Sequence, residues 1–239
     1  IHYHDQQKET LDEAATYGRI YDVPWLRIGL PNYFPSWLRF INEQAEVERE
    51  RLAQEGVARD AEIYTVFASK PGSADNVGLP GSVEPTFKII TTTLARLRPN
   101  AVILIRAHPQ AMDEPYIREG IEAAGDMRIL ISLAHPEVLF ALSRRCIAFS
   151  VSNMLFSGFS GHFMDCCQYP DFHFKEHGEV SIAHGHGPLY VNPLDEDFAS
   201  RFARVLTDDS LFDAPELTNK MDILHRNNPP RPDILLDLL

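Results

Sequence analysis

The sequence contains no long apolar run and few cysteines, and these two absences exclude several classes of protein. None of its 239 residues lies in an apolar stretch that approaches the ~20 residues of a membrane-spanning helix. The first residues resemble neither a signal peptide nor a transit sequence, and the chain begins with Ile1, so we expect a fragment or a processed product. The three cysteines, Cys146, Cys166 and Cys167, lack CxxC spacing, which predicts buried, reduced thiols in a cytoplasmic protein.

Basic side chains are in the minority. The chain has 22 Lys and Arg against 34 Asp and Glu, a formal net charge of -12. Because binding to a nucleic-acid backbone normally requires a basic surface, this balance argues against nucleic acid as a partner. It also argues against an acceptor that is found by broad attraction to anionic lipid. A length of 239 residues with 44% hydrophobic side chains nevertheless allows a substantial core.

From residue 61 onward, strand-like and helical patterns alternate. Short runs that are apolar on both faces predict strands at Ile63–Ala68, Ala101–Ala107, Arg128–Ser132 and Cys146–Val151. Helical spacing of apolar residues predicts helices at Glu84–Arg98, Glu114–Ala124, Pro136–Arg144 and Asp195–Leu206. This alternation predicts an α/β fold, a Rossmann-like parallel sheet with flanking helices.

The chain divides into three parts on this interpretation. Residues 1–60 form an N-terminal helical segment, either a linker or the remnant of an N-terminal domain, with a long helix between Phe34 and Ala58 that begins near Pro35. Residues 61–206 form the nucleotide-binding Rossmann-like domain. Residues 207–239 form a C-terminal tail with a Pro-rich break.

Four segments follow the predicted strands and therefore gather at the carboxyl edge of the sheet, where open parallel sheets bind ligands. They are the glycine-rich Ser69–Ser82, the pair His108-Pro109, the segment Ser132–Glu137 and the hydroxyl-rich Ser150–His162. Together they bring hydroxyls, glycines, a lysine and histidines to one edge.

The His108-Pro109 pair ends the second predicted strand. Proline fixes its own φ and pushes the preceding residue toward extended geometry, which holds the imidazole at the strand end. There His108 can donate to a phosphate oxygen, or act as a catalytic residue that delivers a proton to a leaving group. A strand-terminating turn with a solvated histidine fits the same dipeptide. At His135-Pro136 the better interpretation is a helix cap by Ser132 or His135.

The hydroxyl-rich turn supplies small donors of the kind that hold a phosphate. They are Ser150, Ser152, Asn153 and Ser157, although Ser152 or Asn153 could also be a plain N-cap. Lys70 and Arg106 could neutralise a phosphate or a sugar carboxylate.

One predicted strand ends in His108-Pro109, and about forty residues later another ends in a Ser-rich turn. This pattern resembles the C-terminal, nucleotide-binding half of GT-B glycosyltransferases that use CMP-activated acidic sugars. Members of that group include the bacterial β-Kdo transferases of capsule and lipopolysaccharide assembly and the HP-motif sialyltransferases. The resemblance covers roughly residues 61–206. It implies that His108, Pro109 and the Ser150–Asn153 turn hold the CMP phosphate. It also implies Asp75 as a catalytic carboxylate, although the glutamine of that motif is absent and Asp75 also suits a turn.

The resemblance further implies a function in polysaccharide biosynthesis. An acidic sugar, Kdo or one like sialic acid, would pass from a CMP-sugar donor to a surface-glycan acceptor in the cytoplasm, with the CMP-sugar as substrate and no cofactor required. A missing N-terminal domain or a larger complex would be the other partner. His162, His184 and His186 would then face the sugar or the acceptor.

Several alternatives stay open. A CDP-glycerol-type polyol-phosphate transferase shares the HP strand end, but the turn reads SVSN where that group has Asp-Tyr-Ser-Ser. A UDP-sugar GT-B enzyme needs an acidic ribose-binding residue, for which Asp165 is a candidate. A metal-binding protein is suggested by His173 and His177 in a His-rich segment, without a recognised zinc spacing. A non-catalytic interaction domain would keep the fold without binding nucleotide.

Overall fold

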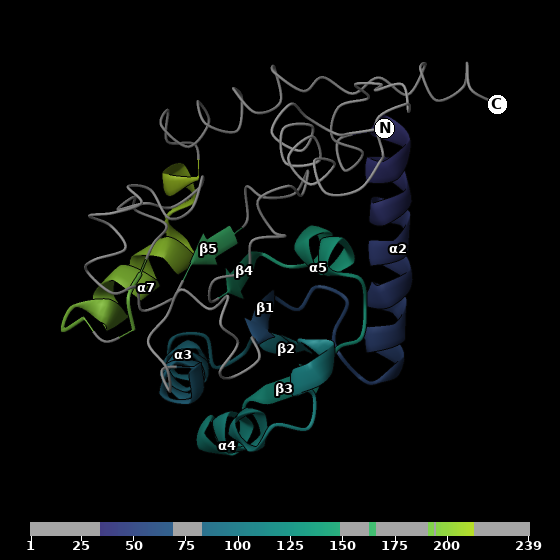
Figure 1. Cartoon of the computed structure of the whole chain (residues 1–239). Helices are drawn as coiled ribbons and strands as arrows, with labels where there is room; N and C mark the ends of the chain where they lie inside the picture. Colours follow the sequence, from purple (N-terminus) through teal and green to yellow (C-terminus); the bar gives the residue numbers. More distant parts are fainter. Residues whose placement is uncertain (1–33, 69–82, 149–162, 166–190, 194, 213–239) are drawn as a thin grey trace, which may run out of the picture.

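The computed structural model describes residues 34–68, 83–148, 163–165, 191–193 and 195–212, and the structural statements below refer to these residues (Figure 1). The α-helices are α2 (Pro35–Gln54), α3 (Val83–Leu97), α4 (Pro115–Ala123), α5 (Pro136–Leu142) and α7 (Phe198–Thr207). The strands are β1 (Ile63–Ala68), β2 (Val102–Ala107), β3 (Arg128–Ile131), β4 (Arg145–Ala148) and β5 (Phe163–Asp165). Two 3-10 turns, η2 (Pro109–Ala111) and η5 (Asp209–Leu211), complete them.

The described strands form one parallel sheet in the order β3-β2-β1-β4-β5. The first strand, β1, lies in the middle of the sheet. β2 and β3 follow on one side of it, and β4 and β5 lie on the other side. This is the order of Rossmann folds, in which the strand order reverses between the first and fourth strands. The predicted α/β fold with a parallel, Rossmann-like sheet is therefore confirmed.

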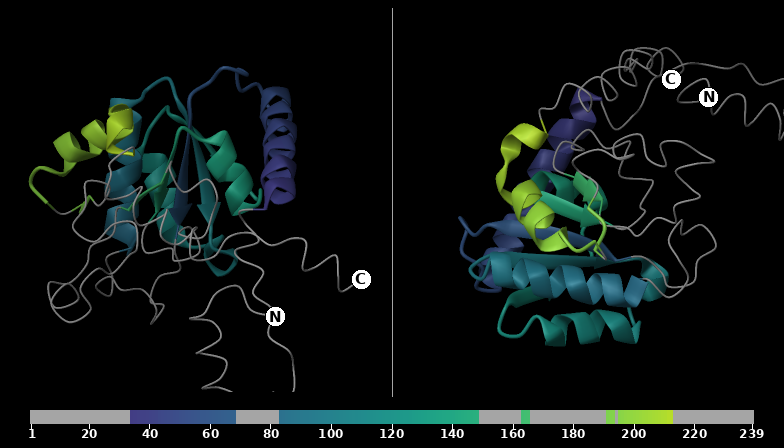
Figure 2. Two further views of the ribbon diagram at one scale, coloured as in Figure 1. Left: turned by 90° about the horizontal axis from the view of Figure 1, so that it is seen from above. Right: turned by 90° about the vertical axis from the view of Figure 1, so that its left-hand side faces the viewer.

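Helices cover both faces of the sheet (Figure 2). On one face, α3, α4 and α7 pack on the strand residues Tyr64, Val66, Ile103, Ile105 and Ile147. On the other face, α2 and α5 pack on the alternate residues, among them Phe67, Val102, Leu104 and Cys146. Apolar residues at successive strand positions are needed because both faces are buried.

The helix expected between Phe34 and Ala58 is confirmed as α2. Pro35 occupies its first turn, where the missing N–H costs nothing, and the chain leaves the helix at Gly56 with a positive φ of 83°. Ile41, Ala45 and Leu52 form its buried stripe against the sheet and α5. α2 therefore belongs to the same packed core as the strands, while the division at residue 60 stays a prediction.

Two strands differ from what the sequence predicted. The segment Arg128–Ser132 was expected to be covered on both faces, but β3 is the edge strand, and Ile131 is 49% exposed. The sequence pattern does not show whether an apolar run is central or at an edge. β5 was not predicted at all, because three residues, Phe163–Asp165, are too few to show a period.

The buried thiol expected at Cys146 is confirmed. Its side chain is fully buried in the core between β4 and α5, and burial raises the pKa of the thiol above its ordinary value. A protonated, inaccessible sulfur of this kind packs as a small hydrophobe. Cys166 and Cys167 lie outside the described residues.

Candidate functional site at the carboxyl edge of the sheet

The carboxyl ends of β1 and β4 lie side by side at the point where the strand order reverses. In the parallel register of these strands, Phe67, the residue before the last of β1, is paired with Ala148, the last residue of β4. The predicted ligand segments 69–82 and 150–162 follow these two strand ends in the sequence. In open parallel sheets this reversal point is where ligands bind, because the adjacent loops diverge to opposite faces.

His108 lies next to this point. Its backbone N–H donates a 2.9 Å hydrogen bond to the carbonyl oxygen of Ala68, the last residue of β1, and its own carbonyl accepts from Ala111 N–H at 2.7 Å. Pro109 thus begins the 3-10 turn η2 directly after β2. The pair ends the strand, as expected, and leaves the imidazole exposed at the carboxyl edge. Whether His108 contacts a phosphate stays a prediction.

Arg106 lies two residues before His108 on β2. Its Nη1 donates a 3.0 Å hydrogen bond to the Ala107 carbonyl, while its Nε is buried and has no hydrogen-bond partner among the described residues. Arg106 faces the layer of α2 and α5, because it pairs with Phe67, which packs against that layer. A substrate role for Arg106 is neither shown nor contradicted by this position.

His135 is the N-cap of α5, so the structure selects His135 from the two caps, Ser132 or His135, that the sequence allowed. Its Nδ1 accepts a hydrogen bond from Glu137 N–H at 3.3 Å, which requires the neutral ring to carry its proton on Nε2. Trp37 of α2 contacts the imidazole edge-on, with ring centroids 5.9 Å apart. Burial, and then the charge of Arg106, lower the pKa of His135. The ring is therefore held neutral at the carboxyl edge.

Sequence reasoning missed the contact between Trp37 and Glu137. The indole Nε1 of Trp37 donates a 2.7 Å hydrogen bond to Oε2 of Glu137, across 100 residues of sequence. Glu137 is only 5% exposed, and burial raises the pKa of its carboxyl, an effect that the Trp37 hydrogen bond partly offsets. The only signal in the sequence is an acidic residue in the first turn of an otherwise apolar helix.

We expect His135 to make the stability of the protein depend on pH. A lowered pKa in the folded state means that the unfolded chain takes up the proton first, so stability is present above pH 6.5 or so and is lost as the pH falls below that value. Protonation of Nδ1 would also remove the cap. His135→Asn keeps a good N-cap without a titrating group and should lose less stability than the wild type between pH 7.5 and 5.5, measured by urea unfolding. Equal losses in both proteins would contradict this assignment.

Most of the other predicted site residues lie outside the described residues. These are Lys70, Asp75, Ser150, Ser152, Asn153, Ser157, His162, His184 and His186. The metal-site candidates His173 and His177 also lie outside them, and no group of three or more His, Cys, Asp or Glu able to hold a metal occurs in the described part. Asp165, the candidate of the UDP-sugar alternative, ends β5 on the far side of β4.

No helix of the described residues is long and apolar enough to cross a membrane.

Comparison with known proteins finds matches among solved structures alone. Neither a protein-family model nor a curated protein sequence matches the chain. One solved structure that is similar to it is described as trehalose-6-phosphate from E. coli bound with UDP-2-fluoro glucose. The match has 14% sequence identity and a TM-score of 0.46, and it covers 84% of this chain and 49% of the other. The chain thus spans about half the length of that structure.

Proposed function

We propose that the chain is the nucleotide-binding half of a glycosyltransferase that uses a nucleotide-activated sugar, with a CMP-activated acidic sugar as the leading donor. The observation that carries the proposal is the hydrogen bond from His108 N–H to the Ala68 carbonyl. It fixes the end of β2 against the end of β1, beside the reversal point of the sheet. A histidine next to such a point is well placed to donate to a phosphate.

In the proposed reaction the protein must stabilise the phosphate of the leaving group. The bond between the anomeric carbon and the phosphate oxygen breaks, and an acceptor hydroxyl oxygen bonds to that carbon and gives its proton to a carboxylate. The departing CMP gains negative charge on the phosphate oxygens. A hydrogen bond from His108 to one of these oxygens would stabilise that charge, and Asp75 is the carboxylate that the resemblance suggests.

Calorimetric titration with nucleotides tests the proposal. We expect the chain to bind CMP more tightly than UMP, CDP or UDP, and His108→Ala to weaken CMP binding about tenfold or more, since a hydrogen bond to a charged group contributes roughly 1.5–3 kcal/mol. Met112→Ala is the matched control, because Met112 follows the same turn with an exposed side chain. Preference for CDP or UDP would instead favour the polyol-phosphate or UDP-sugar alternative.

The proposal fails if no nucleotide binds, or if His108→Ala binds CMP as the wild type does. EDTA should leave the affinity unchanged. Binding or stability that disappears with EDTA would support the metal-binding alternative instead.

A further inference from the structure

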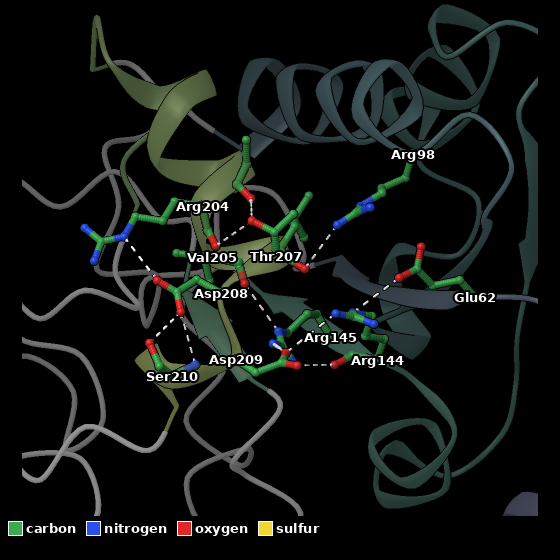
Figure 3. Close-up of polar contacts among 12 residues, drawn as sticks. Glu62, Arg98, Arg144, Arg145, Arg204, Val205, Thr207, Asp208, Asp209 and Ser210 are labelled. Carbon is green, nitrogen blue, oxygen red and sulfur yellow. Dashed lines mark hydrogen bonds and ion pairs between the residues drawn. The ribbon is translucent and has the colours of Figure 1, made fainter.

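Two arginines on the strands that flank β1, Arg106 on β2 and Arg145 on β4, differ sharply in how their guanidinium groups are paired. Arg145 begins β4 at the amino edge of the sheet and is 4% exposed (Figure 3). Its Nε donates to the Val205 carbonyl at 3.3 Å, its Nη1 donates to the Arg144 carbonyl at 2.9 Å, and its Nη2 pairs with Asp209. Every nitrogen of this guanidinium therefore has a partner within the protein, and its role is structural.

Arg106 has no comparable set of partners. Among the described residues only its Nη1 is hydrogen-bonded, to the adjacent Ala107 carbonyl, and no carboxylate forms an ion pair with it. Among the residues that the structure describes, no acceptor is bonded to the side of the guanidinium that carries Nε and Nη2. Nε is the buried donor on this side, and because an unsatisfied buried donor costs roughly 1–3 kcal/mol, an acceptor placed here would be stabilising. The Nε and Nη2 donors together match the two oxygens of a carboxylate.

The surroundings of Arg106 suit an anion. The nearby His135 is neutral and, because its Nδ1 accepts from Glu137 N–H, presents an Nε2–H donor. The Trp37 ring fixes the orientation of this imidazole from α2. Glu137 is the nearest acidic residue in sequence to His135, and one of its oxygens is already held by Trp37 Nε1.

We propose that Arg106, assisted by His135, binds the carboxylate of an acidic sugar on the donor. This rests on the proposed function, which puts the donor phosphate beside His108. In an activated 2-keto sugar acid the carboxylate is attached to the same anomeric carbon that carries the phosphate. Arg106 and His108 both come from the carboxyl end of β2, two residues apart, which fits a carboxylate and a phosphate that are attached to the same carbon.

Titration of the Arg106→Met variant with two ligands distinguishes the carboxylate from the phosphate. Methionine keeps much of the apolar stem without the charge. We expect CMP to bind the variant within about twofold of the wild type and CMP-N-acetylneuraminate to bind about tenfold to a hundredfold more weakly. Arg118→Met, an exposed change on α4 at the other face of the sheet, should alter neither affinity. An equal loss for both ligands would assign Arg106 to the phosphate and overturn the proposal.

A second measurement does not depend on nucleotide binding. In ¹⁵N-labelled full-length chain, the Nε–H signal of Arg106, assigned by its absence in Arg106→Met, should shift when free N-acetylneuraminate is added. Neutral N-acetylmannosamine should leave it unchanged. If the wild type binds no CMP but this signal responds to the sugar acid, the donor-half proposal fails and the carboxylate site stands. If the signal does not respond, the carboxylate site is wrong whatever CMP does.

Discussion

Replacing Arg145 by alanine should lower the free energy of unfolding by about 3 kcal/mol or more, because it removes a buried side chain together with its hydrogen bonds to two backbone carbonyls. Arg145 connects β4 to the end of α7 through Val205 and to η5 through Asp209. Its guanidinium also lies over the Phe212 ring, 3.9 Å from the ring centroid to Cζ. The measurement is urea unfolding at pH 7.

Two further variants test whether the planar, paired guanidinium of Arg145 is the cause of this stability. Arg145→Lys keeps the charge, but a single ammonium cannot reproduce the planar contacts with two carbonyls and a ring, so we expect it to recover less than half of the lost stability. Arg204→Ala removes an exposed arginine from the same region, whose ion pair with Asp208 is 3.5 Å long, and should change stability by under about 0.5 kcal/mol. Wild-type stability of Arg145→Ala would show that the contacts of Arg145 with Val205 and Asp209, drawn in Figure 3, do not hold α7 in place.

The central strands and the helices could be predicted from the sequence because both of their signals are local. Six consecutive apolar or β-branched residues, as in Ile63–Ala68, mark a strand that is covered on both faces, and the structure begins and ends β1 at these residues. The helices after β1, β2 and β3 also agree to within one or two residues at each end. What lies far apart in sequence was not predictable in this way.

The sheet order illustrates the limit. The sequence predicts parallel strands, but only the structure shows that β4 returns to pair with β1 and so creates the reversal point. The sequence likewise does not show which strands lie at the edge of the sheet, and for this reason it predicted that β3 is covered on both faces.

In the candidate site, too, features with a local sequence signal were predictable, whereas contacts between residues far apart in the sequence were not. His108 was identifiable because proline constrains its neighbour, a local effect. The sequence also allowed Ser132 or His135 as the helix cap, and the structure shows that the cap is His135. The hydrogen bond of Trp37 to Glu137 joins residues 100 positions apart and has no local signal. Arg106 and Arg145 look alike in sequence, each at one end of an apolar run. The structure separates them by their partners: every guanidinium nitrogen of Arg145 is paired, whereas Nε of Arg106 has no partner among the described residues.

Gly120→Ala should destabilise the protein by about 2 kcal/mol, although alanine is the better helix former by about 1 kcal/mol. Gly120 lies where α4 packs against Phe87 and Thr91 of α3. A Cβ there would lie 2.4 Å from Cδ1 and Cε1 of Phe87, and the Gly120 carbonyl accepts a 3.1 Å hydrogen bond from Thr91 Oγ1. Phe87 is fully buried and packs edge-on against Tyr116, with centroids 5.3 Å apart, so its ring has no room to move away.

The cost should grow with the size of the added side chain, so Gly120→Val should lose more stability than Gly120→Ala, while Glu119→Ala at the exposed neighbouring position should change it by under about 0.5 kcal/mol. Phe87→Leu combined with Gly120→Ala should cost less than the sum of the two single changes, because the smaller side chain removes the clash. Stabilisation by Gly120→Ala would instead mean that α3 and α4 are further apart than described.

Phe87 lies in the first turns of α3, and this helix directly follows residues 69–82 in the sequence. Any displacement of α3 therefore also moves the end of the segment that we expect to border the donor phosphate. The destabilised variants should therefore bind CMP more weakly even at temperatures where they remain folded.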